Sequence, residues 1–192
     1  MAKQTFVATT TGGAWTTLVS GECTVAALVA NATLATTLVA LRVTLSGGTS
    51  SYILPLNTLP FNTPARLAVG GISLKAGDKL EAMSSTAVDW MTTAIVGTAY
   101  RTAIVSSPAT SAWTTLITGP ATVRALFLSA PSGGTFGVKL LKSVSSEVSL
   151  VLSEELLTGE SKRLMVPIVL AATESIQVKG TSTAYWIATG VE

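Results

Sequence analysis

Ala14-Trp15-Thr16-Thr17-Leu18 occurs twice in the chain, since the same five residues return 98 positions later as Ala112-Trp113-Thr114-Thr115-Leu116. A five-residue identity that contains tryptophan is not expected by chance. The sequence beyond it stays in step, and Trp90 near the end of the first copy matches Trp186 at an offset of 96. The chain is therefore predicted to be one structural unit built twice.

Apolar and polar residues alternate with a period of two in both copies, which is typical of β-strands with one buried face. Charged residues identify the outward side of these strands, because Arg42, Arg124 and Lys139 fall at alternate positions to the apolar residues. The residues predicted to point inward are Cys23, Val25, Ala27, Val29, Val39, Leu41, Val43, Leu45, Leu80 and Ala82 in the first copy, and Ala121, Val123, Ala125, Phe127, Phe136, Val138, Leu140, Ile176 and Val178 in the second.

Each half contains about seven or eight such strands, separated by turn residues every 8–12 positions or so. This pattern predicts an all-β protein of two tandem antiparallel β-sandwich domains, jelly-roll-like and related by the internal repeat. The predicted organisation is an N-terminal arm or edge strand (1–13), a first sandwich (14–99) and a second sandwich (100–192). No Gly/Ser/Pro-rich spacer stands at 97–101, so the sandwiches are expected to keep a fixed relation.

The composition argues against nucleic acid as a partner and for self-assembly. The net charge is +2, divided as +1 in each half, so neither half has the basic character of a nucleic-acid-binding domain. Charged residues make up 11% of the chain, against about 25% in a typical domain. Either the surface is simply rich in Thr and Ser, or much of it is covered in an assembly. We expect a homo-oligomer, and residues 1–10 are a candidate for strand addition to a neighbour's sheet.

Two further sequence features bear on the location of the protein. Residues 1–4 lack the apolar run of a signal peptide. The mostly apolar stretch 24–43 resembles a membrane span in length, but its repeat counterpart contains Arg124, Pro131, Gly133 and Gly134. Two strands joined by a turn explain both copies, so no membrane segment is expected.

Catalytic chemistry is not expected. The chain has no histidine, which removes the Ser-His-Asp and Cys-His mechanisms and most zinc sites. Of the ten acidic residues only Asp78 and Glu174 match across the repeat, so a duplicated acid–base pair or metal site is not predicted. We predict no catalytic, cofactor-binding or metal-ligating residues. Glu154, Glu155 and Glu160 form either a solvated acidic loop or a calcium site.

The single cysteine and the four tryptophans have structural interpretations and functional alternatives. Cys23 matches Ala121 and is expected to be a buried spacer, which excludes an intramolecular disulfide. Trp15, Trp90, Trp113 and Trp186 repeat at matching positions, so packing in or beside the cores is the first interpretation. A sugar-stacking platform, as in a carbohydrate-binding module, is the alternative.

Each half resembles the small β-sandwich domains of structural proteins in tailed-bacteriophage particles. The resemblance rests on Thr16-Thr17-Leu18, on the apolar stretches Val25 to Thr33 and Leu38 to Leu45, and on the Ala-Gly-Asp turn within Leu74 to Ala82. It covers nearly all of residues 14–97. It is weaker over 112–190, where Leu170-Ala171-Ala172-Thr173-Glu174 replaces the Ala-Gly-Asp turn.

The resemblance implies a non-enzymatic virion protein, made in the host cytoplasm and without cofactors. Capsid decoration, in which the protein bridges shell subunits, is the first expected role. A neck, collar, tail or fibre-anchoring role is the second. The implied partners are further copies of the chain together with the major capsid protein or neck and tail proteins. A carbohydrate-binding adhesin module is the alternative from a different class.

Overall fold

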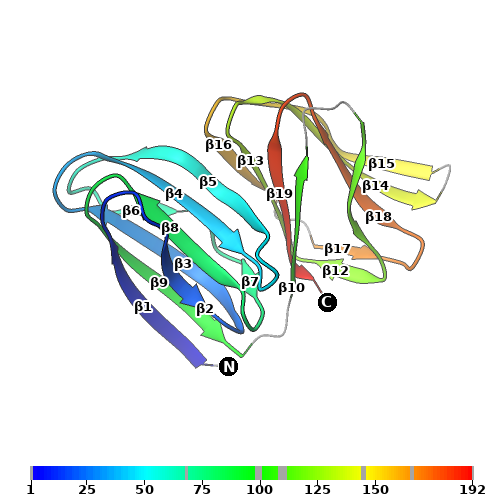
Figure 1. Ribbon diagram of the computed structural model, residues 1–192. Coiled ribbons are helices and arrows are strands. Elements are labelled where there is room, and N and C mark those ends of the chain that lie inside the picture. Colours follow the sequence, from blue (N-terminus) through cyan, green and yellow to red (C-terminus); the bar gives the residue numbers. More distant parts are fainter. Residues whose placement is uncertain are drawn as a thin grey trace.

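The computed structural model describes residues 2–67, 69–97, 101–107, 112–143, 146–164 and 167–191. These residues form nineteen β-strands and no helix (Figure 1). All strand pairs within the sheets are antiparallel. The prediction of an all-β, antiparallel protein is confirmed.

The strands of the first half are β1 (Ala2–Thr10), β2 (Thr16–Ser20), β3 (Cys23–Ala32), β4 (Thr37–Thr44), β5 (Ser50–Leu59), β6 (Ala65–Leu67), β7 (Ser73–Leu74), β8 (Lys79–Ser84) and β9 (Val88–Val96). Those of the second half are β10 (Arg101–Ser107), β11 (Thr114–Thr118), β12 (Ala121–Val123), β13 (Ala125–Ala130), β14 (Gly134–Ser143), β15 (Ser146–Leu156), β16 (Glu160–Leu164), β17 (Ile168–Leu170), β18 (Ser175–Gly180) and β19 (Ala184–Val191).

The strand order within the sheets defines a jelly roll in each half. One sheet of the first half has the order β1-β9-β3-β6, with the short β7 also paired to β3, and the other has the order β2-β8-β4-β5. Most successive strands therefore alternate between the two sheets, which is the interleaved order of an eight-stranded jelly roll. The second half repeats it as β10-β19-β13-β16 and β11-β18-β14-β15, with β12-β17 in place of β3-β7.

The structural repeat includes a strand that the sequence repeat does not reveal. β1 pairs with β9 over its whole length, as β10 pairs with β19. Within the predicted segment 1–13, residues 2–10 thus form an edge strand of the chain's own first sheet. The domain limits 14–99 and 100–192 stay predictions, and residues 98–100 between the halves lie outside the described residues.

Most of the predicted inward positions are confirmed. Trp90 and Trp186 are 2% and 1% exposed and are among the largest buried side chains of the two cores. Phe136 packs edge-on against Trp186, with ring centroids 6.2 Å apart. The other confirmed buried positions are Cys23, Val25, Val39, Leu41, Val43, Leu80, Ala82, Ala121, Val123, Val138, Leu140, Ile176 and Val178, and Leu45 is partly buried against the core.

The predicted inward set is wrong in the second part of β3. The pairing of β3 with β9 shifts between Val25 and Ala27, as at a β-bulge, and an extra residue moves every later side chain to the opposite face. Leu28 is therefore buried in the core, whereas Ala27 and Val29 are only half-buried on the outer face.

The same change of face occurs in the second half, where exposed Arg124 separates β12 from β13. Ala125 and Phe127 are buried, but not in the core for which they were predicted. They belong instead to the apolar cluster of the first sandwich, together with Ile187 of β19. The outer face of the sheet β10-β19-β13-β16 is thus covered by the first half.

The two sandwiches share this buried junction. Strand β5, at the edge of the first sandwich, contacts β13, β16 and β19. Figure 1 shows β5 and β4 lying toward the second sandwich. A shared apolar cluster opposes relative motion because opening it would expose large side chains to water. This agrees with the fixed relation expected from the sequence.

Candidate functional site

Polar contacts reinforce the junction beside the shared apolar cluster. Ser73 donates its backbone N–H to Oγ1 of Thr189 at 2.7 Å, and both residues are buried. The guanidinium of Arg163 lies over the ring of Phe127, with Cζ 5.5 Å from the ring centroid. Burial lowers the pKa of Arg163, although an arginine remains charged.

Arg163 reaches across the junction to a turn of the first sandwich formed by Gly70 and Gly71. A Cβ atom on Gly71 would lie 2.6 Å from Nη2 of Arg163, and one on Gly70 would lie 2.9 Å from the carbonyl oxygen of Ala26. Gly71 also has a φ of +95°, a conformation that glycine adopts without steric cost. Gly71 therefore lets the arginine approach the backbone closely, and Gly70 lets the turn itself pack against the backbone of Ala26.

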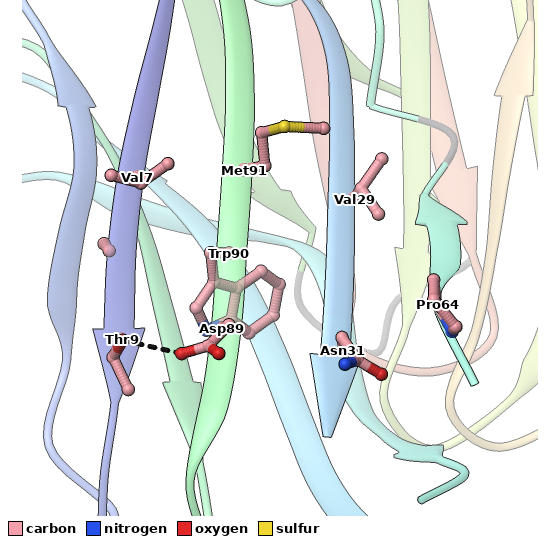
Figure 2. Close-up of a pocket in the computed structure, with 9 residues that line it drawn as sticks. Val7, Thr9, Val29, Asn31, Pro64, Asp89, Trp90 and Met91 are labelled. Atoms are coloured by element: carbon pink, nitrogen blue, oxygen red, sulfur yellow. Dashed lines mark hydrogen bonds between the residues drawn. The ribbon is translucent and has the colours of Figure 1, made fainter. Parts of the chain in front are cut away.

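The outer face of the sheet β1-β9-β3-β6 is open and carries a shallow groove. The groove has a volume of about 590 Å³ and lies across β1, β9 and β3. Figure 2 shows Val7, Val29 and Met91 standing on the same side of these strands. Val7 is 80% exposed and Met91 is 45% exposed. Asp89 accepts a hydrogen bond from Thr9 Oγ1 at 2.7 Å beside them. We call this surface the open face.

Trp15 and Trp113 do not pack in the cores. They lie over cationic side chains on the outer faces of the sheets β2-β8-β4-β5 and β11-β18-β14-β15. Cζ of Arg42 lies 4.2 Å from the ring centroid of Trp15. Nζ of Lys139 and Nζ of Lys179 lie 4.6 and 4.7 Å from the ring centroid of Trp113. Lys139 is on the predicted outward side but is only 8% exposed, so its expected position in solvent is wrong. The tryptophan covers it.

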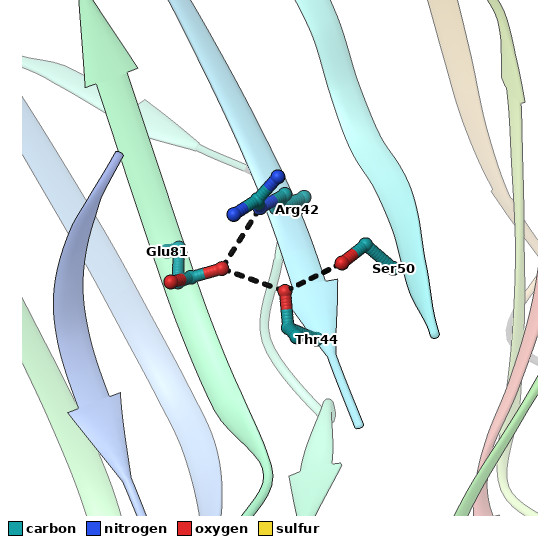
Figure 3. A network of polar contacts seen from close by, with 4 residues as sticks. All are labelled: Arg42, Thr44, Ser50 and Glu81. Carbon is teal, nitrogen blue, oxygen red and sulfur yellow. Dashed lines mark hydrogen bonds and ion pairs between the residues drawn. The ribbon is translucent and has the colours of Figure 1, made fainter. Parts of the chain in front are cut away.

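Beside Trp15, Arg42 belongs to a partly buried polar network (Figure 3). Nε of Arg42 donates to Oε2 of Glu81 at 2.8 Å, and Oγ1 of Thr44 donates to the same oxygen at 2.6 Å. Because the Thr44 proton is used there, Ser50 is the donor in its 2.9 Å contact with Thr44. Burial alone would raise the pKa of Glu81, but the hydrogen bonds from Thr44 and Arg42 and the charges of Arg42 and Lys79 outweigh it. The pKa is lowered overall.

Replacing Glu81 with alanine is expected to destabilise the protein at pH 7 by about 1.5–3 kcal/mol, the usual contribution of hydrogen bonds to a charged group. Because the pKa of Glu81 is lowered by folding, its contribution is present above the ordinary value of 4.5 and is lost as the pH falls through the folded-state value. Urea denaturation of both proteins from pH 7 to pH 3 should show the difference shrinking.

The matched control for Glu81 is Gln177, which takes the equivalent place beside Lys139 in the second sandwich. Among the residues that the structure describes, its side chain hydrogen-bonds only to Thr115, at a long 3.4 Å. Gln177→Ala should therefore change stability by no more than about 0.5 kcal/mol. Equal losses in the two variants, or a Glu81→Ala difference that does not depend on pH, would contradict the role of the network.

A row of aromatic rings crosses the junction and was missed by the sequence analysis. The ring centroid of Tyr52 in β5 lies 5.9 Å from that of Trp15 and 5.3 Å from that of Tyr185 in β19. Next to Tyr52 and Tyr185 lies a cavity of about 310 Å³, bordered also by Pro55 and Pro131. Since Tyr52 and Tyr185 are not repeat counterparts, only the three-dimensional arrangement of the halves brings them together.

Several acidic side chains accept hydrogen bonds within turns or form ion pairs. Asp78 accepts hydrogen bonds from the backbone N–H groups of Ser46 and Lys75 at 2.9 and 3.0 Å. Its repeat counterpart Glu174 accepts one from the N–H of Ala171 at 2.9 Å. The one acidic pair that matches across the repeat therefore stabilises turns, which is a structural use of carboxylates.

The predicted acidic loop is wrong, because Glu154 and Glu155 lie in β15 and Glu160 begins β16. Glu154 forms an ion pair with Lys162, and Glu160 accepts a hydrogen bond from the N–H of Leu157 at 2.7 Å. Glu155 is exposed. Across the described ranges no three His, Cys, Asp or Glu side chains are grouped so that they could hold a metal ion. The absence of catalytic and cofactor-binding residues stays a prediction.

Cys23 is buried, as predicted, with 2% of its surface exposed. Burial raises the pKa of its thiol, which lowers the fraction of reactive thiolate at neutral pH. None of the described residues forms a helix long and apolar enough to span a bilayer.

No protein-family model matches the sequence, and no curated protein matches it. Among solved structures, the fold is similar to the major capsid protein P2 of bacteriophage PM2, with 9% identity, a TM-score of 0.45 and coverage of 100% of this chain and 98% of that chain. It is also similar to the PBSX exported protein XepA, with 8% identity, a TM-score of 0.35 and coverage of 100% and 86%.

A third similarity is to the tandem CBM22-1-CBM22-2 domain of Paenibacillus barcinonensis Xyn10C. It has 10% identity, a TM-score of 0.28 and coverage of 99% of this chain and 91% of that chain. All three TM-scores lie below 0.5, so these similarities do not favour one function over another.

Proposed function

We propose that the protein is a non-enzymatic structural protein of a bacteriophage virion, and that it decorates the capsid by bridging shell subunits. The observation that carries this proposal is the shared apolar cluster in which Ala125, Phe127 and Ile187 of the second half join the core of the first. It makes two jelly rolls into one rigid block. A block of this kind contributes shape and surface to an assembly without needing chemistry.

The mechanism follows from where a pressurised shell is weak. A capsid under internal pressure fails at the seams between subunits, and a rigid block lying across a seam adds buried interface there. Specific interfaces bury about 1,200–2,000 Å². The sparse charge of the chain, 11% of its residues, supports extensive contact with further copies and with the major capsid protein. A neck, collar or fibre-anchoring position would use the same rigidity.

One observation favours a second function, that of a carbohydrate-binding adhesin. Tyr52 and Tyr185, two rings of the aromatic row, border a cavity of about 310 Å³, and Trp15 lies next to Tyr52. Aromatic rings that are partly exposed stack well on sugars. Trp15 is already covered on one face by Arg42, which leaves less of its ring for a ligand. The structural role therefore remains the first proposal.

The test is to locate the protein in purified particles by electron microscopy and to count its copies. Hundreds of copies over the shell are expected for decoration, whereas about a dozen at one vertex would assign it to the neck or collar. Absence from particles would overturn the virion role. If a glycan array then showed binding that Tyr52→Ala abolishes and the exposed-loop variant Leu34→Ala retains, the adhesin would replace it.

A further inference from the structure

The open face of the first sandwich is the repeat counterpart of the face that is buried at the junction. In the first half, Val29 of β3 pairs with Met91 of β9 on one side and with Arg66 of β6 on the other. In the second half, Phe127 of β13 pairs with Ile187 of β19 and with Arg163 of β16 in the same register. Val29, Met91 and Arg66 therefore occupy the positions of Phe127, Ile187 and Arg163.

These equivalent residues differ in exposure. Phe127 and Ile187 are 3% and 0% exposed because the first sandwich covers them. Met91 is 45% exposed, and Arg66 is exposed as well. Val7 of the edge strand, at 80% exposure, extends the same apolar surface. A face that is an interface in one copy of the unit is thus uncovered in the other.

The element that covers the buried face also has an uncovered counterpart. Ile53 of β5 is 3% exposed and borders, with Phe127 and Arg163, a small cavity of about 110 Å³ at the junction. Its counterpart in β15 is Leu150, because each is the extra residue at the same register shift of the hairpin. Leu150 is 37% exposed and the neighbouring Val148 is 46% exposed.

We propose that the open face binds the β15 edge of a second copy of this chain, in the way that the second sandwich's covered face binds β5 within the chain. The inference rests on the proposed structural role and names a surface for self-assembly. The exposed apolar side chains are complementary in kind: Val7 and Met91 on the receiving face, Val148 and Leu150 on the entering edge. Arg66 occupies the position on the open face that is equivalent to Arg163, whose guanidinium approaches the backbone of Gly71 at the junction.

The geometry of this contact is heterologous, since it joins two different surfaces. Each chain would use its open face for one neighbour and its β15 edge for another, so the contact repeats until a ring closes or a chain grows. The open face also carries Asp89 in the position of Tyr185. This polar substitution suits an interface between chains that must stay soluble before assembly.

The first experiment measures association of the purified protein by sedimentation and light scattering over a range of concentrations. Met91→Glu is expected to weaken association about 30-fold or more, as for a buried apolar contact in an interface. Val169→Glu is the matched control, because Val169 of β17 is 73% exposed and lies on neither surface. It should associate as the wild type does. Circular dichroism verifies that both variants fold.

The second experiment identifies the two surfaces by cross-linking. Met91→Cys and Leu150→Cys are made in separate chains that also carry Cys23→Ala, and are treated with a short bismaleimide alone and mixed. Cross-links in the mixture and few in either chain alone are expected. Cross-links between two chains that both carry Met91→Cys would indicate a symmetric contact and would overturn the inference. A wild-type protein that stays monomeric at high concentration in the first experiment would also overturn it.

These outcomes are separate from the fate of the proposed function. Absence of the protein from particles would remove the virion role while leaving the cross-linking result unchanged. Full incorporation of Met91→Glu into particles, with a monomeric wild type in solution, would preserve the virion role and overturn the proposed contact.

Discussion

Replacing Phe127 with alanine is expected to destabilise the protein by about 3–5 kcal/mol, the usual cost of removing a buried phenylalanine ring. The ring is 3% exposed and belongs to the cluster shared by both sandwiches, and Arg163 lies over it. Its loss leaves a cavity at the junction. Calorimetry should show the single cooperative transition of a rigid block resolving into two, because the sandwiches would unfold more independently.

The matched control is Val29→Ala, at the repeat counterpart of Phe127 on the open face. Val29 is half-buried, and in dilute, monomeric protein its truncation should cost no more than about 1 kcal/mol. A similar loss at the two positions would mean that the junction adds nothing to the stability of the second sandwich. One unchanged transition in Phe127→Ala would likewise contradict the shared cluster.

Replacing Trp90 with alanine is expected to have an effect of similar size, about 3–5 kcal/mol. The indole is 2% exposed and its Nε1 donates to Oγ1 of Thr10 at 2.9 Å. Thr10 in turn contacts Ser84 Oγ, which donates to the carbonyl of Thr86 at 2.6 Å. This relay connects β9, β1 and β8, which belong to both sheets of the first sandwich, so the substitution should also speed amide hydrogen exchange in β1.

Trp15→Ala is the control, since it removes the same side chain from the outer face. Trp15 is half-buried over Arg42, and a cation–π contact at such a site contributes about 0.5–1 kcal/mol. Urea denaturation should therefore show a loss of about 1 kcal/mol and no change in β1 exchange. A larger loss than that of Trp90→Ala would reverse the assignment of these two tryptophans.

The sequence was informative about the fold because the same pattern of alternating apolar and polar residues occurs in both halves of the chain. The repeat of Trp15 and Trp113 indicated two units, and comparison with the second copy placed Cys23 and Val25, at the start of β3, correctly in the core. Period-two alternation then placed Val39, Leu41 and Val43 correctly in the core. These features are local, so they depend only on which neighbours along a strand share a face.

The errors and omissions arise where structure depends on distant parts of the chain. The residues around Ala26 contain no sequence pattern that predicts a β-bulge, so the later positions of β3 were assigned to the wrong face. Lys139 was wrongly placed in solvent, because the ring that covers it belongs to Trp113, which precedes β11 and is distant from Lys139 along the chain. The aromatic row of Tyr52 and Tyr185 forms only when the two halves meet. The open face required the register of both sandwiches before it was recognisable as a counterpart of the junction.

The pairing of the first strand of each sandwich with its last also fixes an order of events during synthesis. β1 leaves the ribosome first, yet its partner β9 begins only at Val88, and β10 waits for β19 in the same way. Closing such long loops is slow. The first core is not fully covered until Ile187 has been made. The nascent chain therefore has unpaired strand edges until its synthesis is almost complete. During this interval a protein of this topology is most prone to misassembly.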